Sequence, residues 1–180
     1  MSKPTCDDCQ NNHIDQLKIN QARLWVDHYF LTREVIRDAA SNSPCLEVDL
    51  GVLYTNQDEL GANFARLTGN KHAGQQLAAI LREHITIAVA IVVAAIQGQP
   101  IEQLYQKWKV NAVQISQIYH KYNRRIRFVT LNHHMQEHLA TTLNEAVAII
   151  SGNCQESART GAIALAHINS MANYINSKFY

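Results

Sequence analysis

The sequence has little glycine and little proline: its 180 residues include seven glycines and three prolines. Folds made of many short strands and turns need both residues, so their scarcity disfavours an all-β fold and favours long helices. Acidic and basic residues nearly balance, which leaves a formal net charge of +1. Such a chain has no global field that attracts nucleic acid or a membrane surface, so a partner of either kind would have to use a local patch.

Long hydrophobic segments are also missing. The longest apolar run, 85–96, has about twelve residues, whereas a membrane span needs roughly twenty. We therefore expect a buried core helix there and no membrane partner. The first 13 residues contain no apolar segment typical of a secretion signal. An intracellular, cytoplasmic protein is expected, in which four cysteines are free thiols, namely Cys6, Cys9, Cys45 and Cys154.

Apolar residues recur at helical spacing over four long segments, expected at 14–40, 71–97, 126–150 and 155–177. Turn formers follow the first three of them, namely Ser41–Pro44, Gly98–Pro100 and Ser151–Asn153. Shorter helices are expected in the connections: one near 47–54, one that begins at a cap on Asn56, and two over 101–122. The sequence thus predicts an all-α, up-and-down bundle of four long helices with additional short helices. This single domain covers 14–180 and follows an N-terminal arm, 1–13.

An acid followed by a histidine recurs three times at nearly equal intervals, as Asp27-His28, Glu83-His84 and Glu137-His138. Helical geometry places each of these histidines on the apolar stripe of its own helix. His167 has no preceding acid but lies near the middle of the fourth long segment. Because helices that alternate in direction keep their midpoints at one height, we expect the four rings to form one layer inside the bundle.

Two interpretations of this layer stay open. The first is a structural network, since each buried polar group without a partner costs about 1–3 kcal/mol. The residues expected to complete that network are His167, Thr32, Thr142, Asp27, Glu83 and Glu137. The second is a centre for a divalent metal such as zinc, iron or manganese, because bundle interiors hold such ions with histidines and carboxylates. Its ligands would be His28, His84, His138 and Glu145.

Further spacings bear on the metal interpretation. His134 and His138 lie one helical turn apart, which suits two ligands on one helix face, and His134 with Glu137 forms an H-x-x-E spacing. In a metal site, Glu145 or Glu137 would act as a ligand or as a base. The repeated E-x-x-H of a di-iron bundle does not occur in the sequence. At the N-terminus, Cys6, Cys9 and His13 have C-x-x-C-x-x-x-H spacing without a recognisable fourth ligand, so we expect no site there.

Positive charge is concentrated between residues 101 and 130, where Glu102 is the single acid. The cations of this segment are Lys107, Lys109, Lys121, Arg124, Arg125 and Arg127. Aromatic residues such as Tyr105 and Phe128 are interleaved with them, a combination typical of surfaces that contact phosphates and stack on bases. The alternative is a solvated face with its aromatic residues in the core.

Four sequence patterns resemble a known group of proteins. They are Leu24-Trp25-x-x-His28-x-x-x-Thr32-Arg33, Leu81-x-Glu83-His84-Ile85-x-Ile87-Ala88, Trp108 with Asn111-Ala112, and Met135-x-x-His138-Leu139-x-x-Thr142. On these patterns, residues 24–150 resemble uncharacterised helical-bundle proteins of bacteria and large DNA viruses. The resemblance implies one compact fold and brings no established activity with it.

The sequence therefore leaves three functions open. The first is a non-catalytic structural or accessory interaction protein with a protein partner or self-association, found in the virus particle if the viral resemblance applies. The second is a metal-binding bundle or metalloenzyme that uses the histidine layer. The third is a nucleic-acid-binding module that uses the basic segment 107–127.

Overall fold

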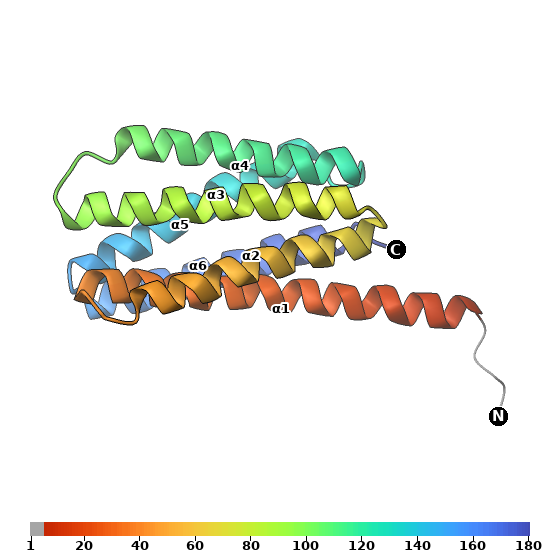
Figure 1. The fold of residues 1–180 in the computed structure, drawn as a ribbon, viewed down its shortest axis with the longest axis horizontal. Helices are drawn as coiled ribbons and strands as arrows, with labels where there is room; N and C mark the ends of the chain where they lie inside the picture. Colours follow the sequence, from red (N-terminus) through yellow and green to blue (C-terminus); the bar gives the residue numbers. More distant parts are fainter. Residues whose placement is uncertain (1–5) are drawn as a thin grey trace, which may run out of the picture.

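The computed structural model describes residues 6–180, with side chains from His13 onward. This part of the chain forms six α-helices and no strand (Figure 1). The helices are α1 (Cys6–Ser41), α2 (Leu46–Thr68), α3 (Lys71–Ile96), α4 (Glu102–Tyr122), α5 (Phe128–Ile150) and α6 (Cys154–Asn176). The prediction of an all-α bundle is confirmed.

The segments expected to be short helices are continuous long ones. Helix α2 has 23 residues and α4 has 21, which is close to the 23 residues of α5. Asn56, predicted to cap a new helix, lies inside α2, where its side-chain Nδ2 donates a hydrogen bond to the carbonyl of Leu24 on α1 (3.0 Å). A polar residue that looks like a local cap therefore makes a contact between two helices, so the division into four long and several short helices is not confirmed.

The helix ends follow the expected turn chemistry. Gly69 follows α2 with φ of 64°, in the left-handed region that favours glycine. Asn70 caps α3 by accepting a hydrogen bond from the Ala73 amide (3.1 Å), and Asn153 caps α6 in the same way from the Glu156 amide (3.0 Å). These side chains satisfy backbone amides that have no partner within the helix.

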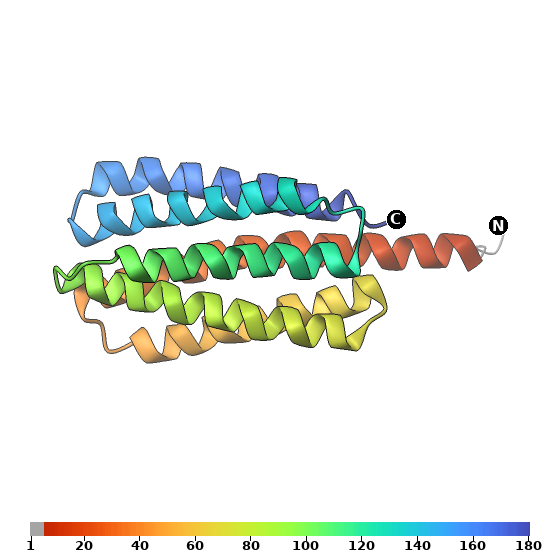
Figure 2. The same ribbon diagram turned by 90° about the horizontal axis from the view of Figure 1, so that it is seen from above.

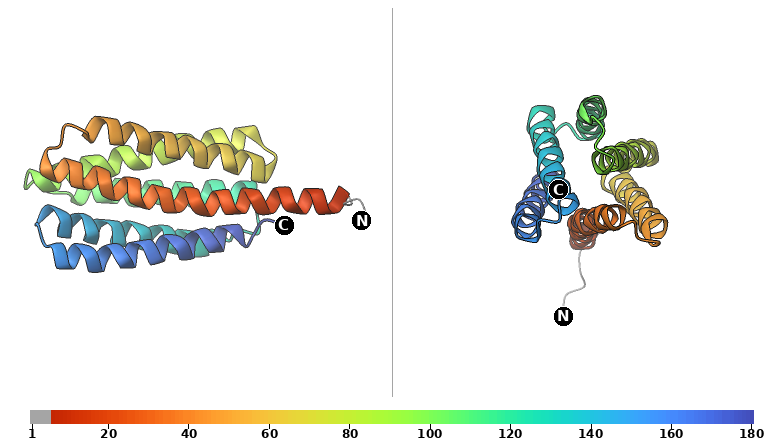
Figure 3. Two further views of the ribbon diagram at one scale, coloured as in Figure 1. Left: turned by 90° about the horizontal axis from the view of Figure 1, so that it is seen from below. Right: turned by 90° about the vertical axis from the view of Figure 1, so that its left-hand side faces the viewer.

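The six helices form a closed arrangement of three helical hairpins, α1–α2, α3–α4 and α5–α6. Each helix contacts the next one along the chain, and α6 returns to contact α1 (Figure 3). The odd-numbered helices α1, α3 and α5 also contact one another. They therefore line the interior of the bundle, whereas each even-numbered helix packs against its two neighbours from outside.

Helix α1 is longer than the others and extends past their ends (Figure 2). It begins at Cys6, so residues 6–13 of the expected N-terminal arm continue this helix. The side chains of Cys6 and Cys9 lie outside the described residues, and His13 is exposed.

The main hydrophobic core draws side chains from all six helices, including Trp25, Leu60, Leu81, Ile115, Leu139 and Met171. Within the described residues, α3 is the one helix that is long and apolar enough to cross a membrane by length and composition alone. The core helix of a soluble protein passes the same test, and α3 buries Leu77, Leu81 and Ile91 in this core.

Candidate functional site

Three of the four predicted histidines meet in the interior. His28 on α1, His84 on α3 and His138 on α5 are each at most 4% exposed. The ring centroid of His138 lies 5.7 Å from that of His28 and 5.9 Å from that of His84, on which it stacks. Trp25 and Trp108 flank the group, with ring centroids 5.5 Å from His28 and 5.0 Å from His84. We call His28, His84 and His138 the histidine core.

Amide side chains of the outer helices orient two rings of the histidine core. His84 donates its Nδ1–H to Oδ1 of Asn111 on α4 (2.8 Å), and its Nε2 is buried without a partner. Gln57 on α2 donates from Nε2 to His28 Nδ1 (3.1 Å). Thr142 Oγ1 lies 3.4 Å from His138 Nδ1, as expected from their i, i+4 spacing.

Burial keeps these rings neutral. It lowers the pKa of His28 to about 3, with a smaller contribution from the neighbouring His84. Burial likewise lowers the pKa of His84 to about 4, although the hydrogen bond that His84 donates to Asn111 opposes this. The pKa of His138 is also held well below its usual range, first by burial and then by His28 and His84. At neutral pH the histidine core carries no charge.

The acids that precede the histidines do not reach the core. Asp27 forms an exposed ion pair with Arg23 (2.7 Å), and Glu83 is exposed. Thr32, also expected in the network, has its Oγ1 buried without a partner. It lines an apolar cavity of about 30 Å³ beside Trp108 and Thr142.

Glu145 does not join the histidines either. This carboxylate is 3% exposed and forms a buried ion pair with Arg33 of α1. Tyr29 lies 3.2 Å from Glu145 Oε1 and donates to the Gly161 carbonyl of α6 (2.9 Å). This group of side chains links α1, α5 and α6. It fits between the helices because Gly161 has no Cβ, which would otherwise collide with the group. Its position identifies Glu145 as the counter-ion of Arg33.

We expect Glu145→Ala to lower the free energy of unfolding by about 3 kcal/mol, because the largely buried Arg33 would lose its compensating charge. Urea denaturation at neutral pH measures this change. The control is Asp58→Ala, which removes an exposed ion pair with Arg82 and should cost about 1 kcal/mol or less. Equal losses in the two variants would contradict a structural role for the buried pair.

A hydrogen bond repeats in the three hairpins. In each, a side chain of the outer helix donates to the backbone carbonyl four residues before the core histidine. Asn56 donates to Leu24 (3.0 Å), Asn111 to Ile80 (3.2 Å) and His167 to His134 (2.8 Å). The third hairpin thus has a histidine where the other two have asparagine. His167 therefore lies between α5 and α6 and does not join the histidine core as predicted.

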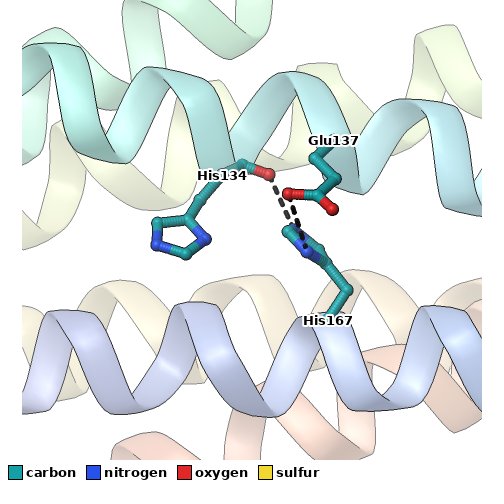
Figure 4. A group of neighbouring side chains, drawn as sticks. All are labelled: His134, Glu137 and His167. Carbon is teal, nitrogen blue, oxygen red and sulfur yellow. Dashed lines mark hydrogen bonds and ion pairs between the residues drawn. The ribbon is translucent and has the colours of Figure 1, made fainter.

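His167 belongs to a cluster between α5 and α6 that also contains His134 and Glu137 (Figure 4). The three residues offer ligand atoms that all lie within 4.8 Å of one another. No other group of three histidine, cysteine or acidic residues among the described side chains comes this close, and the histidine core with Glu145 is not such a group. We call His134, Glu137 and His167 the α5–α6 cluster.

The α5–α6 cluster contains two acceptors that face each other. Because His167 Nε2 donates its hydrogen to the His134 carbonyl, Nδ1 of the neutral ring carries a lone pair. This Nδ1 lies 3.4 Å from the Glu137 carboxylate. His134 Nδ1 is buried and has no partner, and the pKa of His134 is lowered, mainly by burial and then by His167. A cation between these atoms would satisfy all three acceptors.

The structure divides the predicted basic segment into two parts. Lys107 lies on the middle of α4 and lines a hollow with Glu83, while Lys109 lies over the ring of Tyr105 (5.8 Å). The other four cations lie at or after the end of α4, all exposed, namely Lys121, Arg124, Arg125 and Arg127. These two groups therefore do not form one surface stripe.

Two features of these sites were not predicted from the sequence. The amides of Gln57 and Asn111, which orient the core rings, come from other helices and carry no spacing signal relative to the histidines. His134 was noted for its spacing to His138, but its structural partner is His167. The available signal was the H-x-x-E spacing of His134 and Glu137, which brings both residues to neighbouring positions on one helix.

No family model, no curated protein and no solved structure matches this chain. The resemblance to uncharacterised bacterial and viral bundles therefore stays a prediction.

Proposed function

We propose that this protein is a metal-binding helical bundle that holds one divalent transition-metal ion, of the zinc class, in the α5–α6 cluster. The proposal rests on one observation: His167 Nδ1 lies 3.4 Å from the Glu137 carboxylate, while the other ring nitrogen contacts the His134 carbonyl, so that Nδ1 of a neutral ring is an acceptor. Two acceptors at this distance repel each other unless a proton or a metal ion lies between them. Ligand atoms around a tetrahedral zinc ion are about 3.3 Å apart, since each bond is about 2.0–2.1 Å long.

The hydrogen bonding of His167 suits a metal ligand. Ligating histidines in proteins usually donate their second ring N–H to a carbonyl or a carboxylate, which fixes the tautomer and the ring orientation. His167 makes this contact with the His134 carbonyl. Asparagine makes the same contact in the other two hairpins but has no second nitrogen to offer, so the histidine adds a ligand atom only in the third.

Two histidines and one carboxylate supply three ligands, which leaves a fourth position for water or for a group from a partner. The carboxylate side chain of Glu137 is half exposed, so that position faces solvent. We propose that the ion joins α5 to α6 and that the protein acts by binding, as an accessory interaction protein. No reaction is part of this proposal. The histidine core is assigned a structural role.

We expect metal-free protein to bind one Zn²⁺ ion per chain in isothermal titration calorimetry, and bound zinc to raise the melting temperature. His167→Ala should weaken binding by at least about 100-fold, because loss of a direct ligand exceeds the 10- to 100-fold loss seen for outer partners. Glu137→Gln should weaken it by about 10-fold or more, since an amide oxygen is a poorer ligand than a carboxylate.

Two control variants locate the ion. His72→Ala removes an exposed histidine of α3 that contacts Gln76, and it should bind zinc as the parent does. His84→Gln alters the histidine core and should also retain one zinc ion. Zinc lost in His84→Gln but kept in His167→Ala would move the site to the core. No zinc binding by any variant would identify the His167–Glu137 contact as a protonated ion pair and overturn the proposal.

A further inference from the structure

One end of the bundle gathers positive charge from segments far apart in the sequence. At this end α2 meets α3, α4 meets α5, and α6 finishes the bundle (Figure 1). The segments there supply seven cations, namely Arg66, Lys71, Lys121, Arg124, Arg125, Arg127 and Lys178. All except the half-buried Lys178 are exposed, and none forms an ion pair within the described part of the chain. We call these seven residues the basic end.

Side-chain contacts hold these segments together. Tyr122 at the end of α4 donates to Gln76 at the start of α3 (2.9 Å). Asn123 in the α4–α5 connection donates to the Lys178 carbonyl (3.1 Å), and Phe179 packs on Phe64 of α2. The cations therefore share one surface in the folded chain.

Acidic residues are missing from the segments of α2 to α6 that build this end, although the part of α1 that extends past it contains Asp7, Asp8 and Asp15. No aspartate or glutamate occurs at 60–82, 103–136 or 157–180, the three stretches that build it. On the neighbouring part of α1, Asp15 is paired with Lys18 (3.3 Å). The acids gather instead at the opposite connections, where Glu47 and Asp49 begin α2 and Glu156 begins α6. A nearly neutral protein thus has one end that attracts polyanions.

Aromatic side chains accompany the cations. Tyr180 is 76% exposed and its ring lies under the Arg125 guanidinium, 4.5 Å from ring centroid to Cζ. Phe128 lines a hollow together with His120, Lys121 and Arg124. Arginine is suited to phosphate oxygens because its guanidinium offers paired donors, and exposed rings provide faces for unpaired bases.

We propose that the basic end binds single-stranded nucleic acid, with the cations on phosphates and Tyr180 and Phe128 as stacking faces. An anionic membrane fits this surface less well, because the described chain places only three large exposed apolar or aromatic side chains near this end, namely Ile19 on α1, Val129 and Tyr180. Membrane-surface helices bury a wide apolar face, which is missing here. The inference is independent of the metal site.

Fluorescence anisotropy with a labelled oligothymidylate of about 20 residues tests the proposal. With four or five phosphate contacts, affinity should fall by about 50- to 130-fold between 50 and 200 mM salt. Arg124→Gln with Arg127→Gln should weaken binding by at least about tenfold at 50 mM salt and make the salt dependence shallower. Tyr180→Ala should weaken binding without changing the salt dependence, since stacking releases no counterions.

The matched control is Lys107→Gln with Lys109→Gln, which removes the same charge from the same segment but from the middle of α4. This variant should bind as the parent does, with an unchanged melting temperature in all variants. Equal loss of affinity in the two double variants would show that net charge alone causes the weakening, and it would overturn the assignment. Absence of binding at 50 mM salt, or binding to phosphatidylserine vesicles without binding to the oligonucleotide, would overturn it as well.

Discussion

Acidification from pH 7 to pH 4.5 is expected to unfold this protein or bring it close to unfolding. In an unfolded chain His28 and His84 take up protons near pH 6.5, whereas burial in the folded state lowers their pKa values to about 3 and about 4. Because the unfolded state binds more protons, stability falls as the pH drops below 6.5 and continues to fall until the folded-state values are reached.

The expected loss of folding stability at pH 4.5 is large. At pH 4.5 each of these two groups destabilises the folded state by about 2.6 kcal/mol, so the pair removes about 5 kcal/mol of a total that is typically 5–15 kcal/mol. His138 acts in the same direction, since burial lowers its pKa too. Three buried imidazoles thus make the core sensitive to mild acid.

Urea denaturation between pH 7 and pH 4.5 measures the dependence. His84→Gln should reduce the slope of unfolding free energy against pH by about 1.4 kcal/mol per pH unit, because one proton fewer is bound on unfolding. The exposed His72→Gln change should leave the slope unchanged. If His84→Gln kept the slope of the parent, protonation of the histidine core would not be the cause of acid unfolding.

Gly61→Ala is expected to destabilise the protein strongly, although it is a conservative substitution. In a helix interior this change normally stabilises by about 0.5–1 kcal/mol, since alanine loses less backbone entropy on folding. Here a Cβ on Gly61 would lie 2.6 Å from the Gly74 carbonyl oxygen and 2.7 Å from the Ala78 Cβ of α3. Backbone cannot rotate away as a long side chain can, so α2 and α3 would have to separate.

We expect Gly61→Ala to lower the free energy of unfolding by about 3 kcal/mol, the upper part of the range for overpacked cores. Gly51→Ala is the matched control, because Gly51 lies in the same helix and a Cβ there would meet no atom within 4 Å. This control should raise stability by about 0.5–1 kcal/mol. Thermal melts of both variants would refute the close contact if their melting temperatures moved in the same direction.

The outward direction of the acids before the core histidines could have been predicted from helical geometry alone. Consecutive residues in an α-helix point about 100° apart, so Asp27 and Glu83 turn away from the interior that their neighbours His28 and His84 enter. The structure has both acids at or near the surface. This outcome followed from the sequence, although the acids were expected to complete the network.

The sequence by itself determined that the chain is helical, where most helices end, and that His28, His84 and His138 face inward. These features depend on local turn chemistry and on a period of 3.6 residues, which act within one helix. Only the tertiary structure decided that Glu145 pairs with Arg33, that His167 faces Glu137, and that Arg66 and Lys178 join the cations of 121–127. Those relations depend on which helices become neighbours and how each is rotated against the next, and long-range packing rather than local periodicity sets both.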